Sequence, residues 1–138
     1  MTADAQKPKV LFIDDEEDLC EVIKDGLEKQ GFSVQVASSA RQGRELMATI
    51  DAVDAIDIVV SDIRMPEESG LDFLKSVRLA RNLVPFILVS GHMEIDNQTA
   101  QKLGADAAIA KPFKIASLAE KIRSVLKNRE LFAAATKT

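Results

Sequence analysis

Five residues with reactive or metal-binding side chains stand directly after short apolar runs. Asp14 and Asp15 follow VLFI, Asp62 follows IVVS, Ser90 follows FILV and Lys111 follows AAIA. Crowded carboxylates repel one another and raise each other's pKa values unless a cation is present. Carboxylate oxygens suit Mg²⁺, which completes its coordination with water and phosphate oxygens, and a lysine can balance the remaining charge. The set predicts a phosphoryl-transfer site with an ionised aspartate as nucleophile.

The elements that must position these residues form a repeating strand–helix pattern. Apolar runs of this length, bounded by breakers, are typical of buried strands in a parallel sheet, and ligands bind outside the carboxyl ends of such strands. The predicted strands are Lys9–Ile13, Ser33–Ala37, Ile56–Ser61, Val84–Val89 and Ala107–Ala110. The predicted helices are Glu16–Gln30, one after Ser38 or Ser39 that carries Leu46, Met47 and Ile50, Leu71–Arg81, Asp96–Leu103 and one from Ile115. The pattern predicts an α/β fold, (βα)5 and doubly wound, with helices on both faces.

Composition excludes several classes of protein. A chain of 138 residues with 46% apolar residues makes one domain with a full core. A net charge of −4 and a pI near 5.1 argue against direct nucleic-acid binding. The single Cys20 excludes a disulfide framework and favours the cytoplasm. No apolar stretch approaches the roughly 20 residues that a membrane span requires.

The ends of the chain are polar or weakly patterned. We expect residues 1–8 to form a disordered leader, 9–128 to form the domain, and 129–138 to form a C-terminal tail or the start of a linker helix. Leu131 and Phe132 fit either a helix end frayed into solvent or a contact toward an output domain or a second copy.

Four motifs together identify a family resemblance. VLFIDDEED, VVSDIRMPEESG, ILVSGH and GADAAIAKPF occur in this order over roughly Lys9 to Leu126. The chain resembles the receiver domains of bacterial two-component response regulators, including chemotaxis receivers. The resemblance implies a flavodoxin-like five-stranded sheet with strand order 2-1-3-4-5.

The resemblance also implies a phosphoacceptor and its metal ligands. Asp62 is expected to accept the phosphoryl group from a phosphohistidine. Asp15 would bind Mg²⁺ directly, and Asp14 largely through water. The backbone carbonyl of Arg64 would be a further ligand.

Two further roles follow from the resemblance. Lys111 would hold a phosphoryl oxygen or Asp62 itself, before a cis peptide bond to Pro112. Ser90 would be the switch hydroxyl that turns inward to bond the new phosphate.

At the position of Ala108, relatives commonly carry an aromatic residue, and the rotation of that residue reports phosphorylation. Its absence leaves the chemistry intact but predicts a readout through backbone and loop repositioning.

Each of these residues also has a purely structural interpretation. The acids from Asp14 onward could cap a helix and stabilise its dipole, Ser90 could end a strand, and Lys111 could be a surface lysine. We expect His92 to face solvent without a catalytic role, and Cys20 to pack in or near the core.

The leading functional prediction is a cytoplasmic, phosphorylation-activated signalling switch. Its expected partners are a sensor histidine kinase or phosphotransfer protein, and a downstream protein or output domain that contacts the fourth helix, fifth strand and fifth helix. No membrane contact is expected, and the sequence is compatible with a homodimer. An alternative is the N-terminal receiver of a longer regulator with a DNA-binding or enzymatic output domain. In either case we expect the chain to catalyse only its own phosphorylation and dephosphorylation. A small-molecule phosphatase and a dinucleotide-binding module are disfavoured, because a phosphatase-type D-x-D motif and a dinucleotide-binding G-x-G-x-x-G loop are both absent.

Overall fold

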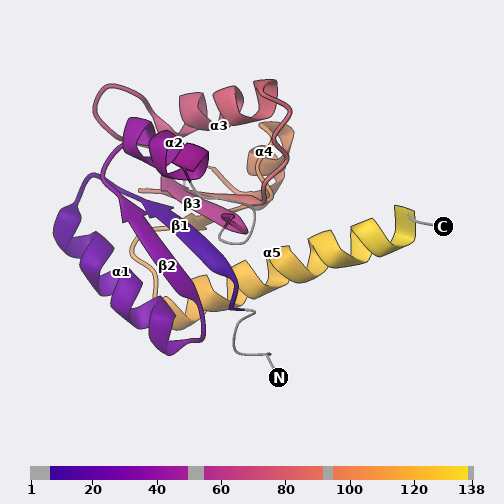
Figure 1. Cartoon of the computed structure of the whole chain (residues 1–138), viewed down its shortest axis with the longest axis horizontal. Helices are drawn as coiled ribbons and strands as arrows, with labels where there is room; N and C mark the ends of the chain where they lie inside the picture. Colours follow the sequence, from indigo (N-terminus) through magenta and orange to yellow (C-terminus); the bar gives the residue numbers. More distant parts are fainter. Residues whose placement is uncertain (1–6, 50–54, 92–94, 137–138) are drawn as a thin grey trace.

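The computed structural model describes residues 7–49, 55–91 and 95–136. Within them, five parallel strands form one sheet in the order β2-β1-β3-β4-β5, which confirms the expected fold (Figure 1). The strands are β1 Lys9–Ile13, β2 Ser33–Ala37, β3 Ile58–Asp62, β4 Phe86–Ser90 and β5 Ala107–Ala110. The helices are α1 Glu17–Lys29, α2 Ala40–Thr49, α3 Gly70–Leu79, α4 Asn97–Lys102 and α5 Ile115–Thr136. The predictions for residues 1–6, Ile50 and His92 fall outside the described residues.

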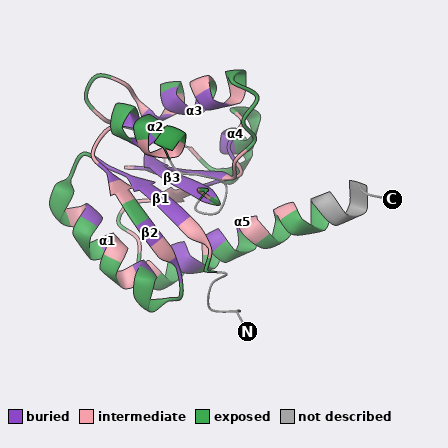
Figure 2. Cartoon of the chain, viewed as in Figure 1, coloured by how far each residue is buried: buried purple, intermediate pink, exposed green. Residues whose placement is uncertain are grey.

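Strands β1, β3, β4 and β5 are mainly apolar because helices cover both faces of the sheet (Figure 2). Alternate residues of β1 point to opposite faces. Val10 and Phe12 join the core beneath α1 and α5, while Leu11 and Ile13 join the core beneath α2, α3 and α4. The central strands therefore pack against a core on each face of the sheet, and this packing fixes the position of their carboxyl ends.

Local signals set most element boundaries. The side chain of Ser69 accepts a hydrogen bond from Asp72 N at the start of α3, and Asp96 does the same with Thr99 N at the start of α4. Gly31 follows α1 with a φ of 100°. The fourth strand begins at Phe86 rather than at the predicted Val84, and the intervening Pro85 has no N–H to donate.

Helix α5 extends beyond the predicted C-terminal end of the domain. It continues without a break through the predicted boundary at residue 128 to Thr136, and its C-terminal half projects from the rest of the molecule (Figure 1). Leu131 and Phe132 are 60% and 69% exposed on this projecting part. The role of the projecting part as a linker helix or as an interface stays a prediction. In the described part of the chain, no helix is long and apolar enough to cross a membrane.

Candidate functional site at the carboxyl edge of the sheet

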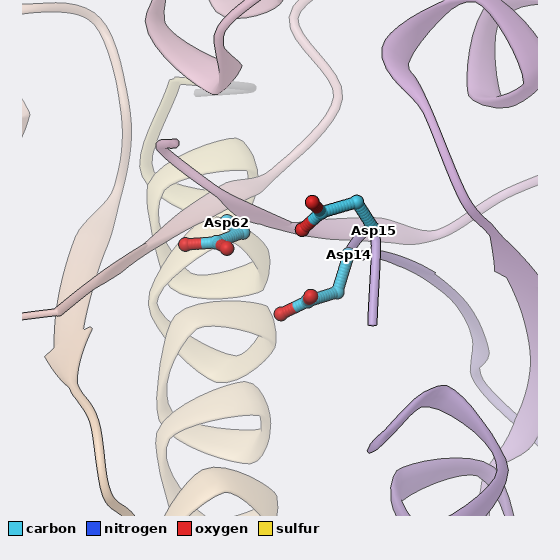
Figure 3. Close-up of side chains that lie close together, drawn as sticks. All are labelled: Asp14, Asp15 and Asp62. Carbon is cyan, nitrogen blue, oxygen red and sulfur yellow. The ribbon is translucent and has the colours of Figure 1, made fainter. Parts of the chain in front are cut away.

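The three predicted aspartates meet at the carboxyl edge of the sheet. Asp14 and Asp15 directly follow β1, and Asp62 is the last residue of β3, the neighbouring strand. One carboxylate oxygen from each lies within 4.8 Å of the others (Figure 3). Asp14 is fully buried, Asp62 is 7% exposed, and Asp15 is exposed to solvent. The cluster is therefore open to solvent on the side of Asp15.

Lys111 reaches the same cluster from the end of β5. Its Nζ lies 2.9 Å from Asp14 Oδ2 and 3.3 Å from Asp62 Oδ2, and Glu16 Oε1 lies 3.4 Å away. The predicted cis peptide between Lys111 and Pro112 is confirmed. Burial by itself lowers the pKa of Lys111, but hydrogen bonding and attraction to Asp14 and Asp62 outweigh burial and raise it. Lys111 is therefore charged and bridges two carboxylates.

The charges of the cluster do not balance. Burial raises the pKa of Asp62, the charge of Asp14 raises it further, and Lys111 opposes both only in part. Three carboxylates against one ammonium leave an excess of negative charge. Their oxygens are the donors that a small hard cation prefers, so the residues present fit a Mg²⁺ ion.

Ser90 lies at the same edge. It is the last residue of β4, is fully buried, and is in register with Ala110. On the other side of β4, Val89 is in register with Asp62. The backbone oxygen of Ser90 accepts a hydrogen bond from Lys111 N at 2.7 Å. The sheet thus brings Ser90 to the strand end beside both Asp62 and Lys111.

The loop after Asp62 folds back onto it. Gly70 N donates to Ile63 O at 2.8 Å, and a Cβ on Gly70 would lie 2.1 Å from Asp62 O, so only glycine fits. Arg64 is exposed at the start of this loop, two residues after Asp62. The role of its carbonyl as a metal ligand stays a prediction.

Cys20 packs in the core beneath α1 and α5, as predicted. Its Sγ lies 3.3 Å from Asp14 O, and burial raises its pKa to about 11. A thiol with such a pKa is protonated and inert at neutral pH.

Several contacts around the site had no signal in the sequence. Ala108, in place of an aromatic residue, is buried, and its backbone groups pair with side chains: its N–H donates to Asn97 Oδ1 at 2.8 Å, and its oxygen accepts from Lys121 Nζ at 3.1 Å. A second contact joins Arg44 of α2 to Glu68 of the β3–α3 loop. Both depend on how helices and loops pack on the sheet, which spacing along the chain does not reveal.

The chain is similar in sequence and fold to known proteins. Residues 10–123 match the family model described as the response regulator receiver domain. The transcriptional regulatory protein CpxR of Escherichia coli is 34% identical over 119 residues, 86% of this chain and 49% of that protein. The sensory transduction protein RegX3 of Mycobacterium tuberculosis is 38% identical over 119 residues, 86% of this chain and 50% of that protein. A response regulator receiver domain protein from Clostridium thermocellum superimposes with a TM-score of 0.80 at 31% identity, covering 91% of this chain and 98% of that one. The chain spans about half the length of CpxR and RegX3.

Proposed function

Because the chain belongs to the receiver-domain family of response regulators, we propose that it is a phosphorylation-controlled signalling switch with Asp62 as the phosphoryl acceptor. The observation that carries the proposal is the aspartate cluster bridged by Lys111, whose Nζ lies 2.9 Å from Asp14 and 3.3 Å from Asp62. A buried carboxylate that neighbours both a second carboxylate and a lysine is typical of functional sites.

The proposed chemistry is a phosphoryl transfer. A carboxylate oxygen of Asp62 attacks the phosphorus of a phosphohistidine on a sensor kinase or phosphotransfer protein. An O–P bond forms, the N–P bond breaks, and the imidazole leaves with the electron pair and takes up a proton. Lys111 is proposed to hold a phosphoryl oxygen. A Mg²⁺ ion held by Asp14, Asp15, Asp62 and the Arg64 carbonyl would offset the charge of the incoming group.

Hydrolysis of the aspartyl phosphate resets the switch. Water attacks the phosphorus of the acyl phosphate, inorganic phosphate leaves, and the carboxylate of Asp62 is restored. The protein is proposed to catalyse only these two reactions on itself. While bound, the phosphoryl group carries roughly −1.5 to −2 charges, and the hydroxyl of Ser90 is proposed to turn toward it.

We propose that the signal leaves through α4, β5 and α5. In this chain the backbone of Ala108 on β5 is held by Asn97 of α4 and Lys121 of α5. A shift of the strand end near Lys111 therefore acts on both helices without an aromatic side chain. This face is the proposed contact for a downstream protein, an output domain or a second copy in a homodimer.

An alternative architecture has the same chemistry. CpxR is named a transcriptional regulatory protein, and this chain spans about half its length. The chain can therefore be the N-terminal receiver of a longer regulator with a DNA-binding or enzymatic output domain. The cytoplasmic location and the lack of direct nucleic-acid or membrane contact stay predictions.

Intact-mass spectrometry after incubation with acetyl phosphate tests the proposal. We expect the wild type to gain one phosphoryl group with Mg²⁺ and none with a chelator. Asp62→Asn should gain none. Asp25→Asn is the matched control, because Asp25 lies on α1 in an exposed pair with Lys29 at 3.2 Å, and it should label like the wild type. Labelling of Asp62→Asn, or none in the wild type, contradicts the proposal.

A further inference from the structure

A three-part contact joins α2 to the loop that follows Asp62. The guanidinium of Arg44 donates two hydrogen bonds to Glu68, NH1 to Oε1 at 3.2 Å and NH2 to Oε2 at 2.7 Å. NH2 also donates to Ser76 Oγ of α3 at 3.0 Å. The guanidinium carbon lies 5.2 Å from the centroid of the Phe73 ring. One side chain of α2 thus contacts both the loop and the helix that it leads into.

This contact differs from an ordinary surface ion pair. A single flexible pair between exposed side chains contributes little to structure. Two parallel hydrogen bonds between a planar guanidinium and a carboxylate fix orientation as well as distance, and the Phe73 ring and Ser76 fix the guanidinium itself. The Glu68 side chain is 30% exposed and that of Arg44 is 46% exposed.

The loop between Asp62 and Gly70 is held at two points. Its base is closed where Gly70 N donates to Ile63 O at 2.8 Å. Near its tip, Glu67 has a φ of 70°, a conformation that residues with a Cβ rarely adopt. The neighbouring Glu68 is the residue that Arg44 holds. The segment between these points includes Arg64, the residue proposed above to offer its carbonyl to the metal.

We propose that Arg44 and Glu68 are a positioning pair for the divalent-cation site, because they hold the loop that carries Arg64, whose carbonyl is proposed above to bind the metal. The inference rests on the proposed function, since it assumes that the cluster of Asp14, Asp15 and Asp62 binds Mg²⁺. Arg44 acts through Glu68 and the loop, and is not itself a ligand.

The sign of the effect distinguishes positioning from simple electrostatics. Removing a positive charge near a cation site strengthens cation binding by Coulomb's law. Removing Arg44 therefore tightens Mg²⁺ binding if only charge matters. If the pair positions the loop, the same change weakens Mg²⁺ binding.

Amide NMR titration of the unphosphorylated full chain with MgCl₂ measures this affinity without any phosphorylation assay. We expect Arg44→Met to weaken Mg²⁺ binding by about 10-fold, the lower end of the loss when an outer-shell partner of a metal ligand is removed. Arg41→Met is the matched control: it removes the same charge from the same helix, and among the described residues Arg41 forms one ion pair, a long, exposed contact of 3.7 Å with Glu45. It should bind Mg²⁺ as tightly as the wild type or slightly tighter.

Two further variants separate geometry from charge and from folding. Arg44→Lys keeps the charge but loses the two-pronged hydrogen bond, so we expect it also to weaken Mg²⁺ binding. The exchanged pair Arg44→Glu with Glu68→Arg keeps the net charge and can remake the contact, so it should recover most of the affinity. The amide spectrum and thermal unfolding of each variant report whether it is folded.

The outcomes separate the two proposals. If the wild type binds no Mg²⁺, the metal site of the proposed function is wrong and the positioning pair falls with it. If the wild type binds Mg²⁺ but Arg44→Met and Arg44→Lys bind it equally well or more tightly, the metal site stands and the positioning pair is overturned.

Discussion

Asp62 carries a conflict of charges that defines the site. It is buried beside Asp14, and both circumstances raise its pKa, while Lys111 offsets them only in part. An ionised carboxylate in such a place costs folding free energy that a solvated aspartate does not. Its reactivity and its cost have the same origin, since its negative charge is kept poorly neutralised beside a second carboxylate.

This conflict predicts a pH-dependent gain in stability for Asp62→Asn, measured without Mg²⁺. The folded pKa of Asp62 lies above the ordinary value of 3.8, so the cost of ionisation is absent below that value, grows as pH rises through the folded pKa, and is complete above it. At neutral pH we expect the variant to require more free energy to unfold than the wild type, because the neutral amide removes the cost of ionising a buried carboxyl whose pKa is raised.

Urea denaturation at neutral pH, and again as the pH approaches 3.8, measures the gap. The difference between the two proteins should shrink toward zero on acidification. Asp25→Asn, which alters an exposed pair, should show no such gap. A wild type more stable than Asp62→Asn at neutral pH contradicts this account.

At the scale of elements, β5 and α4 depend on side chains to complete the sheet edge. β5 is an edge strand, so alternate backbone groups point away from β4 and need other partners. Ala108 finds them in Asn97 of α4 and Lys121 of α5. In the short helix α4, Asn97–Lys102, this hydrogen bond ties the first residue to β5.

Asn97→Ala should loosen α4. The variant removes the acceptor for Ala108 N–H, and losing one such hydrogen bond costs about 1 kcal/mol, equivalent to about fivefold faster opening. Hydrogen–deuterium exchange of α4 should show this increase. Gln98→Ala, a change at the adjacent exposed position of α4, is the control. Equal exchange in the two variants would mean that Asn97 does not anchor the helix.

At the scale of the whole molecule, Asp106 ties the projecting helix to the body. Arg129 of α5 donates to both oxygens of Asp106, at 2.6 Å and 3.0 Å. Asp106 Oδ1 also accepts from Phe86 N at 3.0 Å, and Arg78 of α3 lies 3.6 Å away. Asp106 thus joins α3, β4 and α5 at the end of the sheet opposite the aspartate cluster.

Arg129→Met should free the projecting part of α5. We expect a loss of about 1 kcal/mol in the free energy of unfolding, small because the Arg129 side chain is 36% exposed and its pair is partly screened. Amide exchange after residue 128 should accelerate. Lys127→Met, at an exposed position of the same helix, serves as the control. Unchanged stability and exchange would show that Asp106 does not anchor the helix.

Much of the fold and site could be predicted because the signals are local. The apolar runs before Asp14, Asp62, Ser90 and Lys111 mark buried strands, and parallel strands end at a common edge. The strand order and the individual roles came from the family resemblance, because spacing alone does not say which strands are neighbours.

The sequence by itself determined the alternating elements and the residues that stand at the strand ends, since burial repeats with the period of each element. Only the tertiary structure decided the contacts between Arg44 and Glu68, between Asn97 and Ala108, and between Arg129 and Asp106. Their partners lie 24, 11 and 23 residues apart in the chain. Such polar contacts form only where the packing of helices and loops on the sheet brings the two groups within hydrogen-bond distance, and no local pattern records that approach.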